Sequence, residues 1–263
     1  MKFALIDNIK TESTKGAVGT CPGCGATVVA KCGDVKVHHW AHKGIRNCDP
    51  WWENETAWHR TWKNNFPSEW QESIATDKFT GEKHIADVRT THGLVIEFQH
   101  SFIDQRERKK RESFYKHMVW VVDGTRLERD YTRFLEGAKD LRPAQKQGHY
   151  LVNFPDECFP SNWLGSSMPV IFDFSGHETI NDPKDTRSAL YYLYPKKEGT
   201  KSLLARISRQ SLINDIIVGE FLQQQPAPQQ EPPKPLARNG PGIIQRPSQY
   251  VYDRGRFVRK QRF

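Results

Sequence analysis

Two carboxylates and an amide recur at a spacing that suits metal chemistry. Asp87 is followed after nine residues by Glu97, and Gln99 lies two positions further on. Side chains two apart on a strand point to the same face, so Glu97 and Gln99 project together. Thr91-His92-Gly93 separates two runs of β-forming residues and predicts a hairpin over residues 83–102, which brings Asp87 to the same end. Oxygen ligands of this kind favour a divalent cation such as Mg²⁺.

A second constellation near the N-terminus contains sulfur and imidazole ligands. Cys21 and Cys24 form a C-x2-C pair, and fourteen residues later His39 and His42 form an H-x2-H pair. The spacing predicts a tetrahedral Cys2His2 zinc site, whose closed shell would be structural. Pro-Gly between the cysteines favours a tight turn that lets both thiolates face one ion. Three other residues could replace one ligand: Cys32, His38 and Cys48.

The spelling around these residues carries a family resemblance. IADV at Asp87 and IEFQHSFI from Ile96 resemble the competence protein CoiA-like family. The Asp-x9-Glu-x-Gln pattern also resembles the PD-(D/E)XK nuclease signature, with Gln99 in the lysine position. His39-Trp-Ala-His42 is similar to an HFAH-like spelling of the same family and favours His39 over His38. The resemblance covers roughly residues 18–122.

The resemblance implies a metal-dependent nuclease that acts on DNA. Asp87 and Glu97 would hold one or two Mg²⁺ or Mn²⁺ ions, with Glu55 as a further ligand. The alternative for Glu55 is a helix salt bridge to His59. Gln99 can only form hydrogen bonds, whereas the family's lysine carries charge. The metal must then do more of the electrostatic work, or a neighbouring cation must help; the candidates are Lys83, His84 and Arg89.

The elements that must position these residues alternate between helix and strand. The sequence predicts a helix over 51–66, a strand over 69–76, the hairpin, a helix over 103–117 and a strand over 118–122. This order is the αβββαβ core of the PD-(D/E)XK, restriction-endonuclease-like fold. The fold class is therefore α/β, with an N-terminal zinc-binding module and an α+β C-terminal part.

Domain boundaries follow from these elements. We expect the zinc module in residues 1–50, with one short strand over Phe3–Ile6, and the nuclease-like core in residues 51–124. Residues 125–223 form an accessory α+β region, in which apolar periodicity predicts a last helix over 202–223. Residues 224–263 are expected to be a disordered Pro/Gln-rich linker followed by a basic, aromatic tail.

Charge points to an anionic partner. The net charge is +8 and the isoelectric point is about 9.2, which favours nucleic acid. The helix predicted over 103–117 carries five cations that could track a phosphate backbone: Arg106, Arg108, Lys109, Lys110 and Arg111. The cations and aromatic residues of the tail suit a single strand. The expected partner is DNA, either double-stranded or single-stranded.

The sequence also bears on where the protein is located, and it leaves two other classes of function open. No run approaches the ~18 apolar residues of a membrane helix, and no signal peptide is evident, so we expect a cytoplasmic protein and no membrane. Five cysteines, two of them beside histidines, also suit zinc in a reducing compartment. The alternatives are a catalytically inactive nuclease-fold protein that binds DNA, and a zinc-stabilised scaffold that recruits partners through its basic tail.

Overall fold

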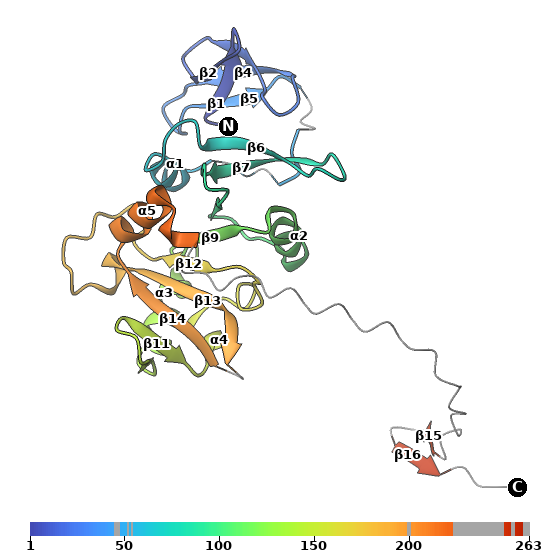
Figure 1. The fold of residues 1–263 in the computed structure, drawn as a ribbon, viewed down its shortest axis with the longest axis vertical. Helices are drawn as coiled ribbons and strands as arrows, with labels where there is room; N and C mark the ends of the chain where they lie inside the picture. Colours follow the sequence, from blue (N-terminus) through green and yellow to red (C-terminus); the bar gives the residue numbers. More distant parts are fainter. Residues whose placement is uncertain are drawn as a thin grey trace, which may run out of the picture. The chain divides into compact units, whose positions relative to one another are not determined.

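The computed structural model describes residues 1–44, 48–51, 53, 55–198, 201–222, 250–253 and 256–259 (Figure 1). The chain divides into two units, Met1–Gln225 and Pro226–Phe263. In the second unit, β15 (Tyr250–Asp253) and β16 (Arg256–Arg259) pair as an antiparallel hairpin. The rest of the linker and tail predicted over 224–263 lies outside the described residues.

The first unit begins with a five-stranded antiparallel sheet in the order β2-β1-β3-β4-β5. Its strands are β1 (Phe3–Ile6), β2 (Ile9–Glu12), β3 (Val18–Thr20), β4 (Thr27–Lys31) and β5 (His39–His42). The prediction of a strand over Phe3–Ile6 is confirmed. Val28 and Trp40 are buried between these strands and form a small apolar core with Cys21.

A nine-stranded mixed sheet forms the larger part of the unit, in the order β10-β11-β14-β13-β12-β9-β8-β7-β6. Its first four strands along the chain are β6 (Gln71–Thr76), β7 (Lys83–Arg89), β8 (Val95–Gln99) and β9 (Met118–Asp123). The others are β10 (Arg142–Pro143), β11 (His149–Val152), β12 (Val170–Asp173), β13 (Leu190–Glu198) and β14 (Lys201–Ile207). Helices α1 (Ala57–Lys63) and α2 (Gln105–Tyr115) complete the order α1-β6-β7-β8-α2-β9, which is the order predicted from the sequence.

Helix α1 is shorter than the prediction of residues 51–66. Thr56 caps its first turn in a capping box with His59, so the helix begins at Ala57. Two indole N–H groups of α1, from Trp58 and Trp62, each donate to Asp173 Oδ2 at 3.0 Å. Asp173 is fully buried on β12, far along the chain. The position of α1 is therefore fixed by a residue outside the predicted core.

The second half of the unit extends the same sheet. β12 runs parallel to β9, with α3 (Glu128–Ala138) and α4 (Pro155–Cys158) in the connection, and β13 and β14 follow as a hairpin. The helix predicted over 202–223 is wrong over residues 202–207, which belong to β14. Leucine and alanine suit either structure, but here β14 pairs with β11 and β13 on both sides. Ser208 then caps α5 (Arg209–Val218).

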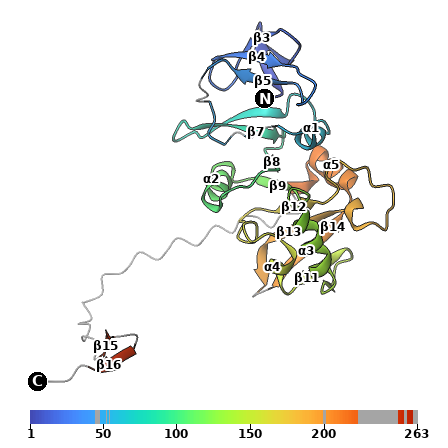
Figure 2. The ribbon, with the colours of Figure 1, turned by 180° about the vertical axis from the view of Figure 1, so that it is seen from behind.

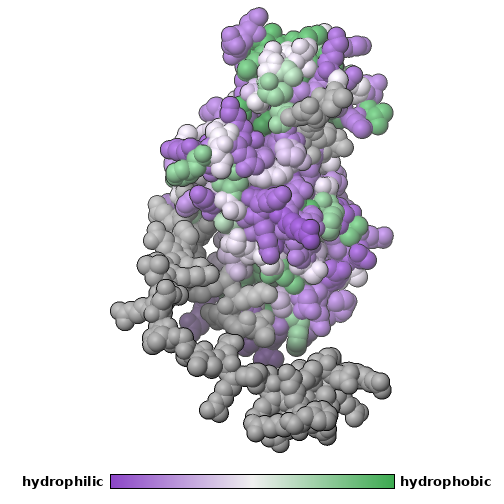
Figure 3. All heavy atoms as spheres, turned by 90° about the vertical axis from the view of Figure 1, so that its right-hand side faces the viewer, coloured by the Kyte–Doolittle hydropathy of each residue, from purple (hydrophilic) through white to green (hydrophobic). Residues whose placement is uncertain are grey.

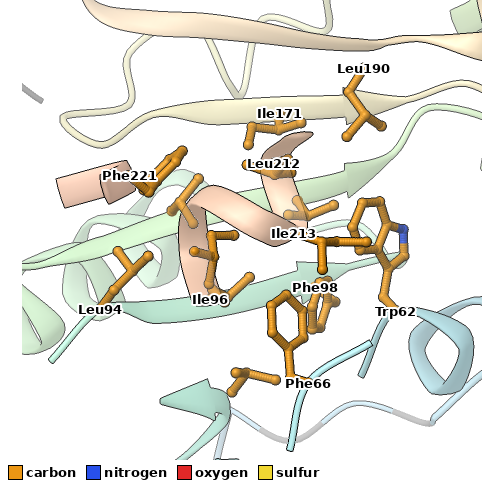
Figure 4. Packing of buried hydrophobic residues seen from close by; sticks show 14 of the residues in the cluster. Trp62, Phe66, Leu94, Ile96, Phe98, Ile171, Leu190, Leu212, Ile213 and Phe221 are labelled. Atoms are coloured by element: carbon orange, nitrogen blue, oxygen red, sulfur yellow. The ribbon is translucent and has the colours of Figure 1, made fainter. Parts of the chain in front are cut away.

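Helices cover the large sheet on both faces. Both views place α2 on the opposite side from α1 and α5 (Figures 1 and 2). Helix α5 packs Leu212 and Ile213 over the strands, next to Trp62 and Phe98 (Figure 4). The side chains of β8 that face α5 belong to one core cluster. Val95 of β8 and Trp120 of β9 belong to a second cluster on the opposite face of the sheet. Burial on both faces explains why β9 reads as an almost continuous apolar run.

Candidate active site and metal cluster

The turn between β7 and β8 places Asp87 beside Glu97. The backbone N–H of Asp87 donates to Glu97 Oε1 at 3.3 Å, and the N–H of Phe98 donates to Asp87 Oδ2 at 3.0 Å. The Glu97 side chain is buried, whereas that of Asp87 is 26 % exposed. The structure thus brings two carboxylates together at the wall of a pocket.

Burial and the neighbouring charge of Asp87 raise the pKa of Glu97 to about 8. The guanidinium of Arg111, 3.3 Å from Glu97 Oε2, acts in the opposite direction. Two crowded carboxylates destabilise each other when both are ionised, and a bound divalent cation would remove that repulsion. The donor set therefore fits a hard cation held by Asp87 and Glu97.

The cation that pairs with Asp87 is Lys63 of α1. Its side chain is buried, and its Nζ atom lies 2.8 Å from Glu55, 3.0 Å from Glu72 and 3.9 Å from Asp87. Burial alone would lower the pKa of Lys63, but the three carboxylates outweigh it and raise the pKa. Lys63 is therefore charged at neutral pH, inside the pocket.

None of the three cations suggested by the sequence takes this position. Lys83 and Arg89 are exposed at the ends of β7. His84 is buried, but its ring stacks on Trp51 and contacts the carboxylates of Asp49 and Glu82. Lys63 lies on another element, and only the tertiary fold brings it to the site.

Glu55 lies just before α1 and lines the same pocket. It pairs with Lys63 and with Arg60, at 2.9 Å from the guanidinium, and these cations outweigh burial and lower its pKa. His59, the alternative partner, instead lies 2.8 Å from the carbonyl oxygen of Phe98. Glu55 therefore reaches the site but already neutralises two cations.

Gln99 is turned toward Glu53, a residue that the sequence reasoning missed. The Gln99 amide donates to Glu53 Oε1 and to the carbonyl oxygen of Ser101 at 3.2 Å. Glu53, not Gln99, lines the pocket with Asp87 and Glu97. The pocket offers about 60 Å³, enough for about four water-sized groups at ~15 Å³ each. A metal ion with its waters fits this space.

The basic run of α2 is divided between interior and surface. Arg108 and Arg111 are buried, where Arg108 pairs with Glu112 and Arg111 with Glu97 and Glu107. The prediction of a five-cation phosphate track is therefore wrong for these two residues, because their positions face the sheet. Arg106, Lys109 and Lys110 are exposed. The side of the molecule that carries α2 faces the viewer in Figure 3 and is largely hydrophilic in its middle part.

The N-terminal cysteines form a separate cluster. The ligand atoms of Cys21, Cys24, His42 and Cys48 all lie within 4.8 Å of one another. Cys21 Sγ lies 3.4 Å from Cys48 Sγ, and Cys24 Sγ lies 3.3 Å from His42 Nε2. Bonds of ~2.3 Å to sulfur and ~2.0 Å to nitrogen in a tetrahedral shell give ligand separations of ~3.5–3.8 Å. The four residues thus fit one zinc ion.

This Cys3His set corrects the predicted Cys2His2 set. His39 and His42 both lie on β5, and side chains three apart on a strand point to opposite faces. His39 therefore cannot face the same ion as His42, and its Nδ1 lies 2.8 Å from the carbonyl oxygen of Val37. Cys48, one of the alternatives from the sequence, takes the fourth position, and Cys32 and His38 are not part of the cluster.

A comparison with known protein families finds a match in this N-terminal region. The family model for the N-terminal domain of the competence protein CoiA matches residues 9–50. The match supports a CoiA-like family assignment. It includes all four cysteine and histidine residues of the cluster. No curated protein and no solved structure matches this chain. Within its described residues, no helix is long and apolar enough to cross a membrane.

Proposed function

We propose that this CoiA-like protein is a metal-dependent nuclease that cleaves phosphodiester bonds of DNA at the pocket of Asp87 and Glu97. The observation that carries the proposal is the buried Lys63 ammonium, 3.9 Å from Asp87 in the same pocket. A charged lysine beside paired carboxylates supplies the positive charge that Gln99 lacks. Lys63 thus takes the role that the PD-(D/E)XK pattern gives to its lysine.

The roles of the residues follow from their charges. Asp87 and Glu97 would hold one Mg²⁺ or Mn²⁺ ion, which supplies Lewis-acid stabilisation of the phosphate when bound. Lys63 remains protonated and stabilises the negative charge that develops on the phosphate oxygens. Glu55 and Glu72 hold the ammonium in position through their ion pairs. Gln99 orients Glu53 at the edge of the pocket.

Cleavage of plasmid and single-stranded DNA tests these roles. Asp87→Ala and Glu97→Ala should abolish cleavage in Mg²⁺ and Mn²⁺. Lys63→Met should lower the rate by about 10²-fold or more, the size expected for loss of one preorganised charge. Lys83→Met is the matched control, because Lys83 is exposed on β7, and it should cleave like the wild type.

A lysine exchange separates chemistry from folding. Lys63→Met leaves buried carboxylates without their partner and will lower stability, so thermal unfolding must accompany each rate. In the double variant Lys63→Met with Gln99→Lys, the new ammonium meets Glu53 at the pocket edge and should restore part of the rate. Wild-type rates in Asp87→Ala and Glu97→Ala would refute the proposed site.

The second candidate is a DNA-binding protein without cleavage. One observation favours it: Lys63 is shared by three carboxylates, so much of the charge in the pocket is already neutralised. Such a protein would bind DNA equally well with and without Mg²⁺. It would show no hydrolysis at any metal concentration, including in Mn²⁺.

A further inference from the structure

A groove of about 810 Å³ adjoins the acidic pocket. Trp51 lines both the groove and the pocket, so the two spaces are neighbours at this side chain. One wall is α2, with Arg106, Lys110 and Phe114. The opposite wall is the loop between β6 and β7, with Asp77 and other polar residues. A volume of this order holds a small chain segment or a few nucleotides.

The carboxylates in the groove are already engaged within the protein. Asp77 and Asp104 accept backbone N–H groups of Thr80 and Arg106, Glu82 pairs with His84, and Glu107 pairs with Arg111. The side chains of Arg106 and Lys110, in contrast, form no hydrogen bond or ion pair with any residue that the structure describes. Arg106 and Lys110 are therefore available to pair with the phosphates of a ligand.

Aromatic side chains accompany these cations. Phe114 lies edge-on to Trp51, with ring centroids 5.5 Å apart, and stands at the groove. Phe79 is 94 % exposed at the tip of the β6–β7 loop. Asp77 holds that tip by accepting the N–H of Phe79 at 2.8 Å. A bare aromatic ring on a fixed turn is an arrangement on which an unpaired base can stack.

We infer that this groove holds a single strand of DNA and leads it past Trp51 to the acidic pocket. Phosphates of the strand meet Arg106 and Lys110, and its bases stack on Phe79 and Phe114. A duplex keeps its bases paired and stacked, so it could not use these rings. The inference rests on the proposed function and specifies the form of its substrate.

Binding without cleavage tests the groove by itself. The full chain, with its zinc retained, is titrated in buffer without Mg²⁺ or Mn²⁺ against a fluorescent 12-nucleotide strand and against the same sequence as a duplex, at several salt concentrations. The single strand should bind more tightly. Arg106→Gln with Lys110→Gln should reduce the slope of log affinity against log salt by about 1.4, because each phosphate contact of a single strand contributes about 0.7.

The matched control is Arg142→Gln with Lys146→Gln. It removes the same charges from exposed positions on and beside β10, outside the groove, and should leave the slope unchanged. Phe79→Ala should weaken binding of the single strand by about fivefold or more and leave duplex binding unchanged. Any basic residue elsewhere in the chain contributes equally to all variants.

Three results would overturn the inference: equal or tighter binding of the duplex, equal slopes for the groove and control variants, or no binding of either DNA. Because the assay needs no Mg²⁺ or Mn²⁺, its result is independent of cleavage. A protein with a working groove and no hydrolysis would refute the proposed nuclease alone. Cleavage with an unaltered slope in the groove variant would refute the groove alone.

Discussion

At the scale of single residues, Glu72 shows how the pocket tolerates buried charge. Its backbone lies in the left-handed region, at φ 46°, which costs about 1–2 kcal/mol for a residue with a side chain. The carboxylate accepts the backbone N–H groups of Lys2 and Phe3 at 2.7 and 3.0 Å and pairs with Lys63. These partners offset the strain and join the N-terminal sheet to β6. Burial raises the pKa of Glu72, but Lys63 and the two amides outweigh it and lower the pKa to about 2.

The lowered pKa of Glu72 predicts a dependence of stability on acid. The stabilisation is complete above the ordinary pKa of 4.5 and is lost as the pH falls toward 2. The loss is about 1.4 kcal/mol per pH unit in this window. Urea unfolding from pH 7 to pH 2.5 should therefore show the wild type approaching Glu72→Gln as the pH falls. Exposed Glu69→Gln should follow the wild type; parallel profiles for Glu72→Gln and the wild type would contradict the prediction.

At the scale of elements, the sequence predicts those helices and strands that depend on a local pattern of residues. The strand of Phe3–Ile6, the hairpin of Asp87 and Glu97, and β9 follow from alternating or continuous apolar residues. The choice of Cys48 as the fourth metal ligand, the role of Lys63 and the strand β14 do not follow from local pattern. Each depends on a partner that is distant in the sequence. The H-x2-H spacing is compatible with a zinc site on a helix or turn, and only the strand conformation of β5 excludes it.

The metal cluster predicts different outcomes for residues that look alike in the sequence. Cys48→Ser should lose zinc, because it removes one of four ligands. His39→Ala should keep about one zinc per chain, because His39 lies outside the cluster. Metal analysis of the purified variants decides this, with Cys32→Ser as a further thiol control. Retained zinc in Cys48→Ser together with lost zinc in His39→Ala would restore the Cys2His2 set.

At the scale of the whole first unit, the metal cluster and the acidic pocket are joined through neighbouring residues. Cys48 is followed by Asp49, whose Oδ2 accepts the N–H of Ile85 at 2.8 Å on β7. A side chain on Gly23, between the two cysteines, would lie 3.1 Å from Ile85. β7 also carries Asp87. A zinc ion bound by the cluster would thus help to hold the strand that carries Asp87.

Removal of zinc should therefore be detectable at β7. A chelator should speed hydrogen exchange at the Ile85 amide, because Asp49 loses its anchored neighbour Cys48. Asp49→Asn should speed the same amide while zinc remains bound, since the amide side chain is a weaker acceptor. Val121 in the central strand β9 is the internal control and should stay protected. Unchanged exchange at Ile85 after chelation would show that the two sites are independent.

The hydrogen bonds from α1 to Asp173 can form only late in the synthesis of the protein. Trp58 and Trp62 precede their shared acceptor by 115 and 111 residues. A ribosome adds about 5–20 residues per second, so an interval on the order of 5–25 s separates the synthesis of these tryptophans from the synthesis of Asp173. During that interval two large aromatic side chains lack the carboxylate that anchors them, and Lys63 is not yet fixed. We therefore expect the nascent chain to expose apolar surface of α1 after β9 has emerged and before β12 has.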